Sequence, residues 1–279
     1  MAPIAKQPVG VFDSGVGGLT VLHELLVSLP GEDYLYLGDT ARFPYGDRTA
    51  RELRAFSIEI AEHLLAAGAK LLVIACNAAS SAALGTVEEH VRRAGREIDV
   101  IGVVAPATQL AVAGSRSGRI GLMATPATVA SGAYERAVHG ADPHVHLESV
   151  ACADLAPIIQ GGFPFDEHVV ETVRGYCGPL REAHVDTVIL GCTHYPLVAP
   201  MLQRSLGRGV ILVTSGAGVA RSVERALASR ELLNPQTGEG AYRFMCTADV
   251  ESFRDLGTRF LQMPLGEVVH VELRGRVAA

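Results

Sequence analysis

Short apolar runs bounded by glycine or polar residues alternate along this chain with stretches in which apolar residues recur at helical spacing. Such runs, rich in Val, Ile and Leu, are typical of parallel strands buried on both faces. The first part contains four predicted strands: Val9–Phe12, Asp33–Leu37, Leu71–Ala75 and a run near Asp99 to Val104. Helical spacing predicts two helices, one through Leu22, Leu25, Leu26 and Leu29 that Pro30-Gly31 ends, and one from Leu53 to Ala67. The segment Gly38 to Asp47 is expected to be a long polar loop.

The same pattern restarts further along the chain. Arg119–Met123 predicts a strand, and a helix is expected after it. Gly121 lies 111 residues after Gly10, and this offset places Thr125 on Ser14. We therefore expect an α/β fold in which two βα halves with parallel sheets face each other across a cleft.

The segment from Val210–Val213 onward has no counterpart in this repeat. It is expected to add two helices, at about 219–233 and 250–260, around a strand near 241–246. Because it has no partner of its own, we expect it to pack back on the first half. This predicts a discontinuous first domain, residues 1–101 plus 213–279, and a second domain, residues 102–212.

Composition excludes several classes of protein. With 279 residues, 48% of them hydrophobic, the chain can bury its core without disulfides. A net charge of −6 and scattered arginines argue against nucleic acid as the main partner. No apolar stretch approaches the length of a membrane span, and the N-terminus shows no apolar leader. An odd number of cysteines, five, without paired spacing indicates reduced thiols, so we expect a cytoplasmic protein with no membrane partner.

Lysine is nearly absent, and this bears on cofactors. The only lysines are Lys6 and Lys70, whereas pyridoxal phosphate chemistry requires a lysine Schiff base in the site. Lys6 lies in the N-terminal tail, and Lys70 precedes its strand at the end opposite the ligand edge. The sequence therefore predicts no pyridoxal phosphate, and we expect no other cofactor.

Two cysteines end matching strands. Cys76 follows Leu71–Ala75 and is followed by Asn77, whereas Cys192 follows Thr187–Gly191 and precedes a polar pair, Thr193 and His194. Ligands of open α/β sheets bind beyond the carboxyl ends of the strands. A buried cysteine is more often a small core residue, and that reading fits the other three, Cys152, Cys177 and Cys246.

Two opposed thiols can invert a stereocentre without a cofactor. One thiolate removes a proton from one face of a carbon, and the other thiol delivers a proton to the opposite face. Asp13 and His194 are candidates to shuttle or position these protons. Asp13 is also placed to face the ammonium group of a substrate.

A glycine-rich turn and a long loop could hold the anionic groups of a substrate. Asp13-Ser14-Gly15-Val16-Gly17-Gly18 joins a strand to a helix, where backbone N–H groups can approach an anion. Its alternative interpretation is a tight turn in which Asp13 or Ser14 caps the helix. Phe43-Pro44-Tyr45-Gly46 could bind a carboxylate through its amides or could be a plain surface turn.

Metal ligation is weakly supported. Cys192 and His194 lack a CxxC or HxxxH partner set with suitable spacing. His144 and His146 form an HxH pair on a predicted strand, which is typical of its solvated face. We expect no metal.

Four motifs resemble those of the glutamate racemase family. They are Asp13-Ser14-Gly15-Val16-Gly17-Gly18-Leu19, Pro44-Tyr45-Gly46, Ala75-Cys76-Asn77 and Gly191-Cys192-Thr193-His194-Tyr195-Pro196-Leu197. They occur in the family's order and spread over most of the chain. The resemblance implies cofactor-independent interconversion of L- and D-glutamate, which supplies D-glutamate for bacterial peptidoglycan. It also implies two similar parallel-sheet domains related by pseudo-twofold symmetry, with the active site in the cleft between them.

The resemblance also implies roles for individual residues. Cys76 and Cys192 would be the catalytic acid and base, the first deprotonating the D-isomer and the second the L-isomer. The residues expected to bind substrate or tune the thiols are Asp13, Ser14, Tyr45, Gly46, Asn77, Ala78, Thr193 and His194, and Thr125 is similar to a family threonine near the substrate. Homodimers are common in the family, which leaves a homodimer as a candidate assembly.

Three positions depart from the family pattern. Ala78 stands where the family usually has Thr, so only its backbone N–H can donate. Gln160 stands where Glu is common, and Thr214 where Asp is common. These departures affect the expected affinity for substrate, not the expected reaction.

Other functions remain open at this stage. One is an aspartate or hydantoin racemase, or a decarboxylase with one essential cysteine, on the same scaffold. Another is a non-catalytic amino-acid-binding or regulatory protein, although pure binding would not require both cysteines.

Overall fold

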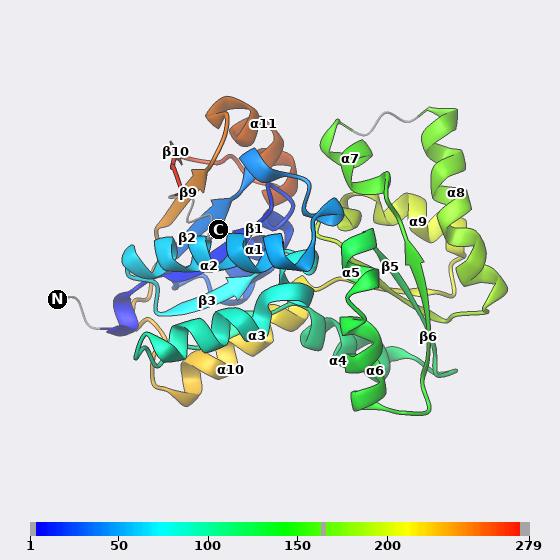
Figure 1. Ribbon diagram of the computed structural model, residues 1–279, viewed down its shortest axis with the longest axis horizontal. Coiled ribbons are helices and arrows are strands. Elements are labelled where there is room, and N and C mark those ends of the chain that lie inside the picture. Colours follow the sequence, from blue (N-terminus) through cyan, green and yellow to red (C-terminus); the bar gives the residue numbers. More distant parts are fainter. Residues whose placement is uncertain (1–3, 163–165, 274–279) are drawn as a thin grey trace.

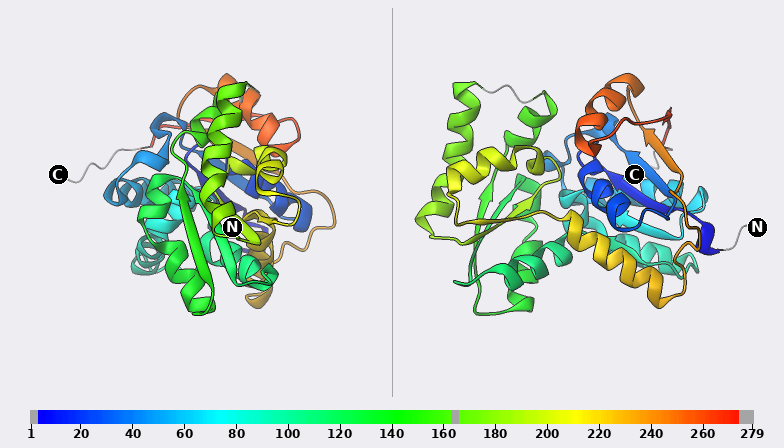
Figure 2. Two further views of the ribbon diagram at one scale, coloured as in Figure 1. Left: turned by 90° about the vertical axis from the view of Figure 1, so that its right-hand side faces the viewer. Right: turned by 180° about the vertical axis from the view of Figure 1, so that it is seen from behind.

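The computed structural model describes residues 4–162 and 166–273 (Figure 1). Two parallel β-sheets with helices packed around them lie next to each other along the longest axis of the molecule (Figures 1 and 2). The predicted α/β class with two parallel sheets is confirmed. Residues 1–3, part of the N-terminus predicted to lack a leader, lie outside the described residues, as do residues 163–165 and 274–279 of the two predicted domains.

The first sheet contains six strands in the order β10-β9-β2-β1-β3-β4, and every neighbouring pair is parallel. Its strands are β1 (Val9–Asp13), β2 (Tyr34–Gly38), β3 (Leu71–Ile74), β4 (Val100–Gly102), β9 (Tyr242–Cys246) and β10 (Val268–His270). The central strands β1, β2 and β3 are buried at every residue, as their unbroken apolar runs predict.

The second sheet repeats the first in strand order. It runs β6-β5-β7-β8, all parallel, which is the order β2-β1-β3-β4 shifted by four strands. Its strands are β5 (Arg119–Ala124), β6 (His146–Ala151), β7 (Thr187–Gly191) and β8 (Ile211–Val213). Cys76 after β3 and Cys192 after β7 therefore occupy equivalent places in the two halves.

Helices cover the sheets on both faces (Figures 1 and 2). Around the first sheet lie α1 (Leu19–Ser28), α2 (Ala50–Ala66), α3 (Asn77–Arg93), α10 (Gly216–Ser229) and α11 (Val250–Leu261). With the second sheet lie α4 (Val104–Gly114), α5 (Pro126–Ala130), α6 (Ala133–Ala141), α7 (Leu155–Gln160), α8 (Glu167–Glu182) and α9 (Ala199–Leu206). Helix α4 also packs against α10, so the helices of the two halves are in contact.

Alternation along β1 distributes the core over two faces. Val9 and Val11 belong to the cluster that includes residues of α1 and α10, whereas Phe12 packs with residues of α2 and α3. Successive side chains of a strand point to opposite faces, so both faces of this sheet are buried. The first of these clusters continues into the second half through Met123 and Leu190, which makes one core shared by both halves.

The segment after β8 returns to the first sheet. β9 pairs with β2, with Tyr242 opposite Tyr34, and β10 pairs with β9. The prediction that this segment packs back on the first half is confirmed. The exact division into domains near residues 102 and 212 stays a prediction.

One predicted boundary near a sheet edge is wrong, and one predicted loop holds local structure. The strand expected over 99–104 ends at Gly102, and Val104 already begins α4. The Val103 N–H bonds the Ser80 hydroxyl at 3.0 Å instead of a strand, and Pro106 is compatible with the first turn of a helix. The loop expected over 38–47 contains two short 3₁₀ helices, η2 (Thr40–Arg42) and η3 (Tyr45–Asp47).

Three further differences concern the ends of two elements and one strand that was not predicted. Helix α10 runs over Gly216–Ser229 and not 219–233. β6 begins at His146, so His144 lies outside the strand and the two histidines do not form a strand-borne pair. β10 has three residues, too few for a periodic pattern, and was not predicted.

A buried ion pair fixes the amino edge of the first sheet. Lys70 lies just before β3, and its ammonium is 2.6 Å from the Glu32 carboxylate, with both side chains almost fully buried. The Lys70 ammonium also donates to the carbonyls of Ala5 and Leu232, and Glu32 accepts from the Asn234 N–H at 2.7 Å. Four separate segments of chain therefore meet at one charge pair.

We predict that Lys70→Met lowers the free energy of unfolding by about 3–5 kcal/mol, because it leaves the Glu32 carboxylate buried without its cation. Urea denaturation followed by circular dichroism measures this loss. The control is Arg93→Met, which breaks an exposed pair with Glu89 and should cost less than about 1 kcal/mol. Equal losses in the two variants would contradict the prediction.

Candidate functional site

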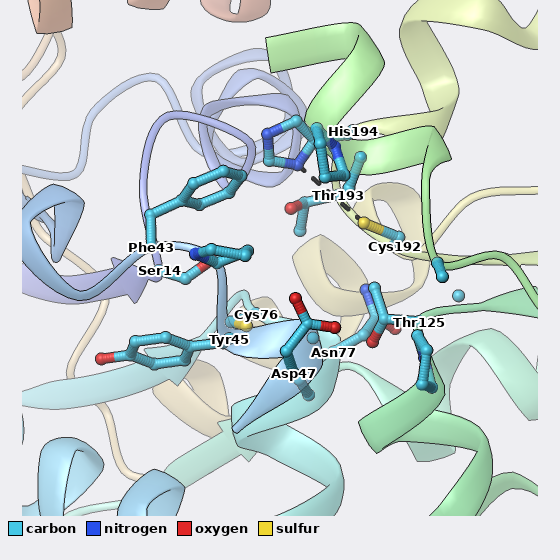
Figure 3. A pocket seen from close by; sticks show the side chains of 18 residues that line it. Ser14, Phe43, Tyr45, Asp47, Cys76, Asn77, Thr125, Cys192, Thr193 and His194 are labelled. Carbon is cyan, nitrogen blue, oxygen red and sulfur yellow. Dashed lines mark hydrogen bonds between the residues drawn. The ribbon is translucent and has the colours of Figure 1, made fainter. Parts of the chain in front are cut away.

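A small cavity of about 30 Å³ lies where the carboxyl ends of the two sheets face each other (Figure 3). Half of its lining comes from loops of the first sheet and half from loops of the second. The lining residues are Ser14, Phe43, Pro44, Tyr45, Gly46, Asp47, Cys76, Asn77 and Ala78 from the first half, and Thr125, Pro126, Ala153, Ala156, Pro157, Gly191, Cys192, Thr193 and His194 from the second. This is the sheet edge at which the sequence predicted a site.

Both predicted cysteines line this cavity, each from a different sheet. Cys76 follows β3 and is the N-cap residue of α3, and Cys192 follows β7. The side chains are 5% and 8% exposed, so both thiols are shielded from bulk solvent. The other three cysteines are completely buried in the core, as predicted for them.

The surroundings of the two thiols disfavour their ionisation. Burial and the nearby Asp13 carboxylate raise the pKa of Cys76 well above its ordinary value, although the Ala79 N–H opposes the shift. Burial raises the pKa of Cys192 to about 12, against a smaller lowering by the His194 N–H. In this structure both thiols are therefore favoured in the protonated form near neutral pH.

Asp13 lies behind the cavity wall, at the end of β1. It is completely buried, and its carboxylate accepts from the Gly15 N–H at 3.1 Å and from the Thr193 hydroxyl at 3.4 Å. Burial raises the pKa of Asp13, while backbone N–H groups of the turn, Gly18 first, lower it. The carboxylate therefore ties the first turn to the loop that carries Cys192.

The glycines of that turn are required by close packing. A Cβ on Gly17 would lie 2.3 Å from the Thr193 hydroxyl oxygen and 2.5 Å from Nδ1 of His194. The turn thus presses against the Cys192 loop of the other half. The alternative that Asp13 or Ser14 caps the helix is wrong, because α1 starts at Leu19 and its N-cap residue is Gly18.

His194 lies between Cys192 and Gln160. Its Nδ1 is 3.9 Å from the Cys192 sulfur (Figure 3). Its Nε2 is 2.8 Å from Oε1 of Gln160. Since Oε1 can only accept, Nε2 carries the proton and Nδ1 presents its lone pair to the thiol. Burial lowers the pKa of His194 to about 3, so the ring is neutral. The rings of Phe43 and Phe260 pack near it, with ring centroids 5.6 and 5.0 Å away.

The predicted loop 43–46 contributes to the cavity wall, but the Tyr45 hydroxyl does not enter the cavity. The Tyr45 hydroxyl donates to Asp39 and points away from the cavity, so the ring and backbone of Tyr45 line the wall (Figure 3). A Cβ on Gly46 would come within 2.9 Å of the Thr125 Cβ, so glycine lets this loop meet the second half.

Asn77 and Ala78 are the first two residues of helix α3, and both line the cavity. The Oδ1 atom of Asn77 accepts a hydrogen bond of 2.6 Å from the hydroxyl of Tyr134, a residue of α6. Ser14, Thr193 and Thr125 also line the cavity, so of the predicted site residues only Asp13 is absent from the lining itself.

Sequence reasoning missed several wall residues. Phe43 and Asp47 belong to a loop that was recognised, but no signal marked them individually. Pro126, Ala153, Ala156 and Pro157 are apolar residues that no chemical motif could have identified. Tyr134 reaches the site only through the packing of α6 against α3.

Within residues 4–162 and 166–273, no group of three or more His, Cys, Asp or Glu side chains is arranged to hold a metal ion. None of the helices described there is both long and apolar enough to cross a membrane.

Comparison with known proteins shows the family. The sequence model of the Asp/Glu/Hydantoin racemase family matches residues 20–223. The glutamate racemase of Beutenbergia cavernae is 43% identical over 284 aligned residues, which cover 98% of this chain and 96% of that protein.

Solved structures agree with the sequence match. The crystal structure of a glutamate racemase isoform from Bacillus anthracis has a TM-score of 0.90 at 35% identity, covering 96% of this chain and 98% of that one. The glutamate racemase of Francisella tularensis, solved with D-glutamate, has a TM-score of 0.88 at 32% identity with the same coverage. The chain with two thiols at equivalent strand ends thus belongs to the Asp/Glu/Hydantoin racemase family, and within it to the glutamate racemases, which are isomerases.

Proposed function

We propose that this protein interconverts L- and D-glutamate without a cofactor, with Cys76 and Cys192 as the two bases. The observation that carries the proposal is that two buried thiols face one cavity from topologically equivalent strands of opposing sheets. A carbon held between them has one thiol on each face. In one direction the Cys76 thiolate takes the Cα proton of D-glutamate, and the Cys192 thiol gives its proton to the opposite face.

The substrate itself supplies a means to activate the thiols. Burial and Asp13 raise the pKa of Cys76, so the closed form holds a thiol and not a thiolate there. The ammonium group of an amino acid acts in the opposite direction to Asp13, because a nearby positive charge favours the ionised thiol. On the other side, the Nδ1 lone pair of His194 orients the Cys192 S–H.

The cavity must open for this reaction. About 30 Å³ is room for roughly two water molecules, which is less than glutamate requires. The walls come from two separate sheets, so a small separation of the halves enlarges the space between them. Closure over the substrate then excludes water from the carbanion-like transition state.

The remaining polar groups of the wall suit a dicarboxylic amino acid. Ser14 and Asn77 offer side-chain donors to carboxylate oxygens, and the amides of Gly46 and Ala78 add backbone donors to the same wall. The Thr193 hydroxyl donates to Asp13 instead. Asp13 is placed to influence the ammonium group through the turn. The proposal includes supply of D-glutamate for peptidoglycan in the cytoplasm, and assembly as a homodimer as the family resemblance suggests.

We expect Cys76→Ser and Cys192→Ser each to lower racemisation in both directions by at least about 100-fold, since each removes an acid–base group. The measurements are circular dichroism decay of D- and L-glutamate and deuterium incorporation at Cα in D₂O. Cys177→Ser, a buried core cysteine on α8, is the matched control and should retain activity. A variant of either proposed base with near-normal racemisation would exclude the two-base mechanism. Carbon dioxide release sensitive to only one cysteine would instead favour a decarboxylase.

Asp13→Asn is expected to lower the pKa of both thiols, because the Asp13 charge is among the causes that raise them. The pH dependence of iodoacetamide alkylation, resolved for each cysteine by mass spectrometry, should therefore move to lower pH at Cys76 and Cys192. Asp255→Asn, on the exposed side of α11, should leave the profiles unchanged. A profile that stays in place in Asp13→Asn would show that Asp13 exerts no field on the thiols.

Gln160→Glu is expected to raise the pKa of His194 from about 3, because a carboxylate beside Nε2 favours the imidazolium. His194 would then gain a proton at a higher pH than in the unsubstituted protein, which NMR titration of its ring signals detects. Gln160→Met removes the same hydrogen bond without adding charge and should give no such rise. The same titration in both variants would count against a direct His194–Gln160 contact.

A further inference from the structure

Tyr134 joins the second half of the molecule to the first. It lies on α6, is completely buried, and donates its hydroxyl proton to Oδ1 of Asn77 at 2.6 Å. Asn77 is the first residue of α3 and directly follows Cys76. This single hydrogen bond therefore reaches from the other half to the residue next to one of the thiols.

The amide nitrogen of Asn77 is left without a partner. It is buried, and none of the described residues accepts a hydrogen bond from it. Asn77 lines the cavity, where it lies beside Cys76 and Thr125 in Figure 3. An unpaired buried donor costs about 1–3 kcal/mol, so a donor retained at a cavity wall points to a ligand that accepts from it.

The described geometry leaves Nδ2 as the free end of the carboxamide, because Oδ1 is the atom that lies 2.6 Å from the Tyr134 hydroxyl. With the hydroxyl donating, Oδ1 is the atom that accepts and Nδ2 is the atom left over. A rotated carboxamide would present an oxygen to the cavity, which would repel a carboxylate. A phenylalanine at 134 would fill nearly the same volume without imposing this choice.

We propose that Tyr134 is a positioning residue for substrate binding: it fixes the Asn77 carboxamide so that Nδ2 donates to a carboxylate of the amino-acid substrate. The inference rests on the proposed function for the identity of that substrate. Because α6 belongs to the other half, the donor is oriented only while the two halves are packed together. Tyr134 touches Asn77, not the reacting atoms, and so acts on binding more than on proton transfer.

The first test is Tyr134→Phe. KM for D-glutamate should rise about tenfold while kcat changes much less, as expected for one lost hydrogen bond that orients a binding group. The matched control is Tyr34→Phe, which removes another fully buried tyrosine hydroxyl that donates to the carbonyls of Leu25 and Leu29, remote from the cavity. An unchanged KM in Tyr134→Phe, or the same change in both variants, overturns the proposal.

A double-mutant cycle separates positioning from general destabilisation. If Tyr134 acts through Asn77, then Tyr134→Phe should add little to KM in a background that already carries Asn77→Ala. A purely structural effect would add fully in that background. Full additivity therefore overturns the proposal.

Asn77→Asp tests the free donor if Tyr134→Phe fails to fold. A carboxylate still accepts from the Tyr134 hydroxyl but offers an oxygen to the cavity in place of N–H. KM should rise at least tenfold with an unchanged melting temperature. Unchanged affinity in Asn77→Asp overturns the proposal.

Calorimetric titration with D-glutamate distinguishes this inference from the proposed function. If the unsubstituted protein binds D-glutamate but does not racemise it, the proposed reaction fails, and the effect of Tyr134→Phe on Kd still decides the role of Tyr134. If the unsubstituted protein neither racemises nor binds D-glutamate, both proposals fail.

Discussion

The close approach between the turn after β1 and the loop after β7 is the contact on which the site depends. Gly17 leaves no space for a side chain against Thr193 and His194, and the Asp13 carboxylate bonds the Thr193 hydroxyl across the same junction. The two halves repeat one strand order, so each brings its own thiol to the same kind of position. Holding the turns together converts two equivalent strand ends into one cavity with a sulfur on each side.

That contact has an electrostatic cost. It removes Cys76, Cys192 and His194 from solvent, and burial raises the pKa of both thiols and lowers that of the imidazole. The two thiols and the imidazole are therefore favoured in their neutral forms. The substrate adds its own charges between them, and these buried groups respond strongly because little water screens them.

Features of the fold that depend on neighbouring residues in the chain could be predicted from the sequence. β7 occupies the predicted residues Thr187–Gly191, and both cysteines of the cavity were found because a polar residue follows each at the end of an apolar run. The exact end of β4 was missed, since Val103 bonds a side chain and not a strand. Features that depend on contacts between distant segments had no local signal.

Gln160 and Tyr134 illustrate why. Gln160 was visible only as a departure from a family pattern, and its bond to His194 joins the end of α7 to the loop after β7. Tyr134 is one aromatic residue on an amphipathic helix, and nothing near it in the chain marks its bond to Asn77. Even Tyr45, which was identified by its motif, directs its hydroxyl toward Asp39 and not into the cavity. Side-chain direction in this site is decided by the packing of the two halves, which periodicity does not describe.

Enclosure of the thiols also bears on the chemical lifetime of the protein. Peroxides oxidise the thiolate and not the thiol, and the first product readily condenses with a second sulfur nearby. Two neighbouring cysteines at an open, polar surface would be prone to that loss. Here both line a cavity of about 30 Å³, are almost fully buried and are favoured as thiols, so the resting protein presents neither the reactive ion nor ready access to oxidants.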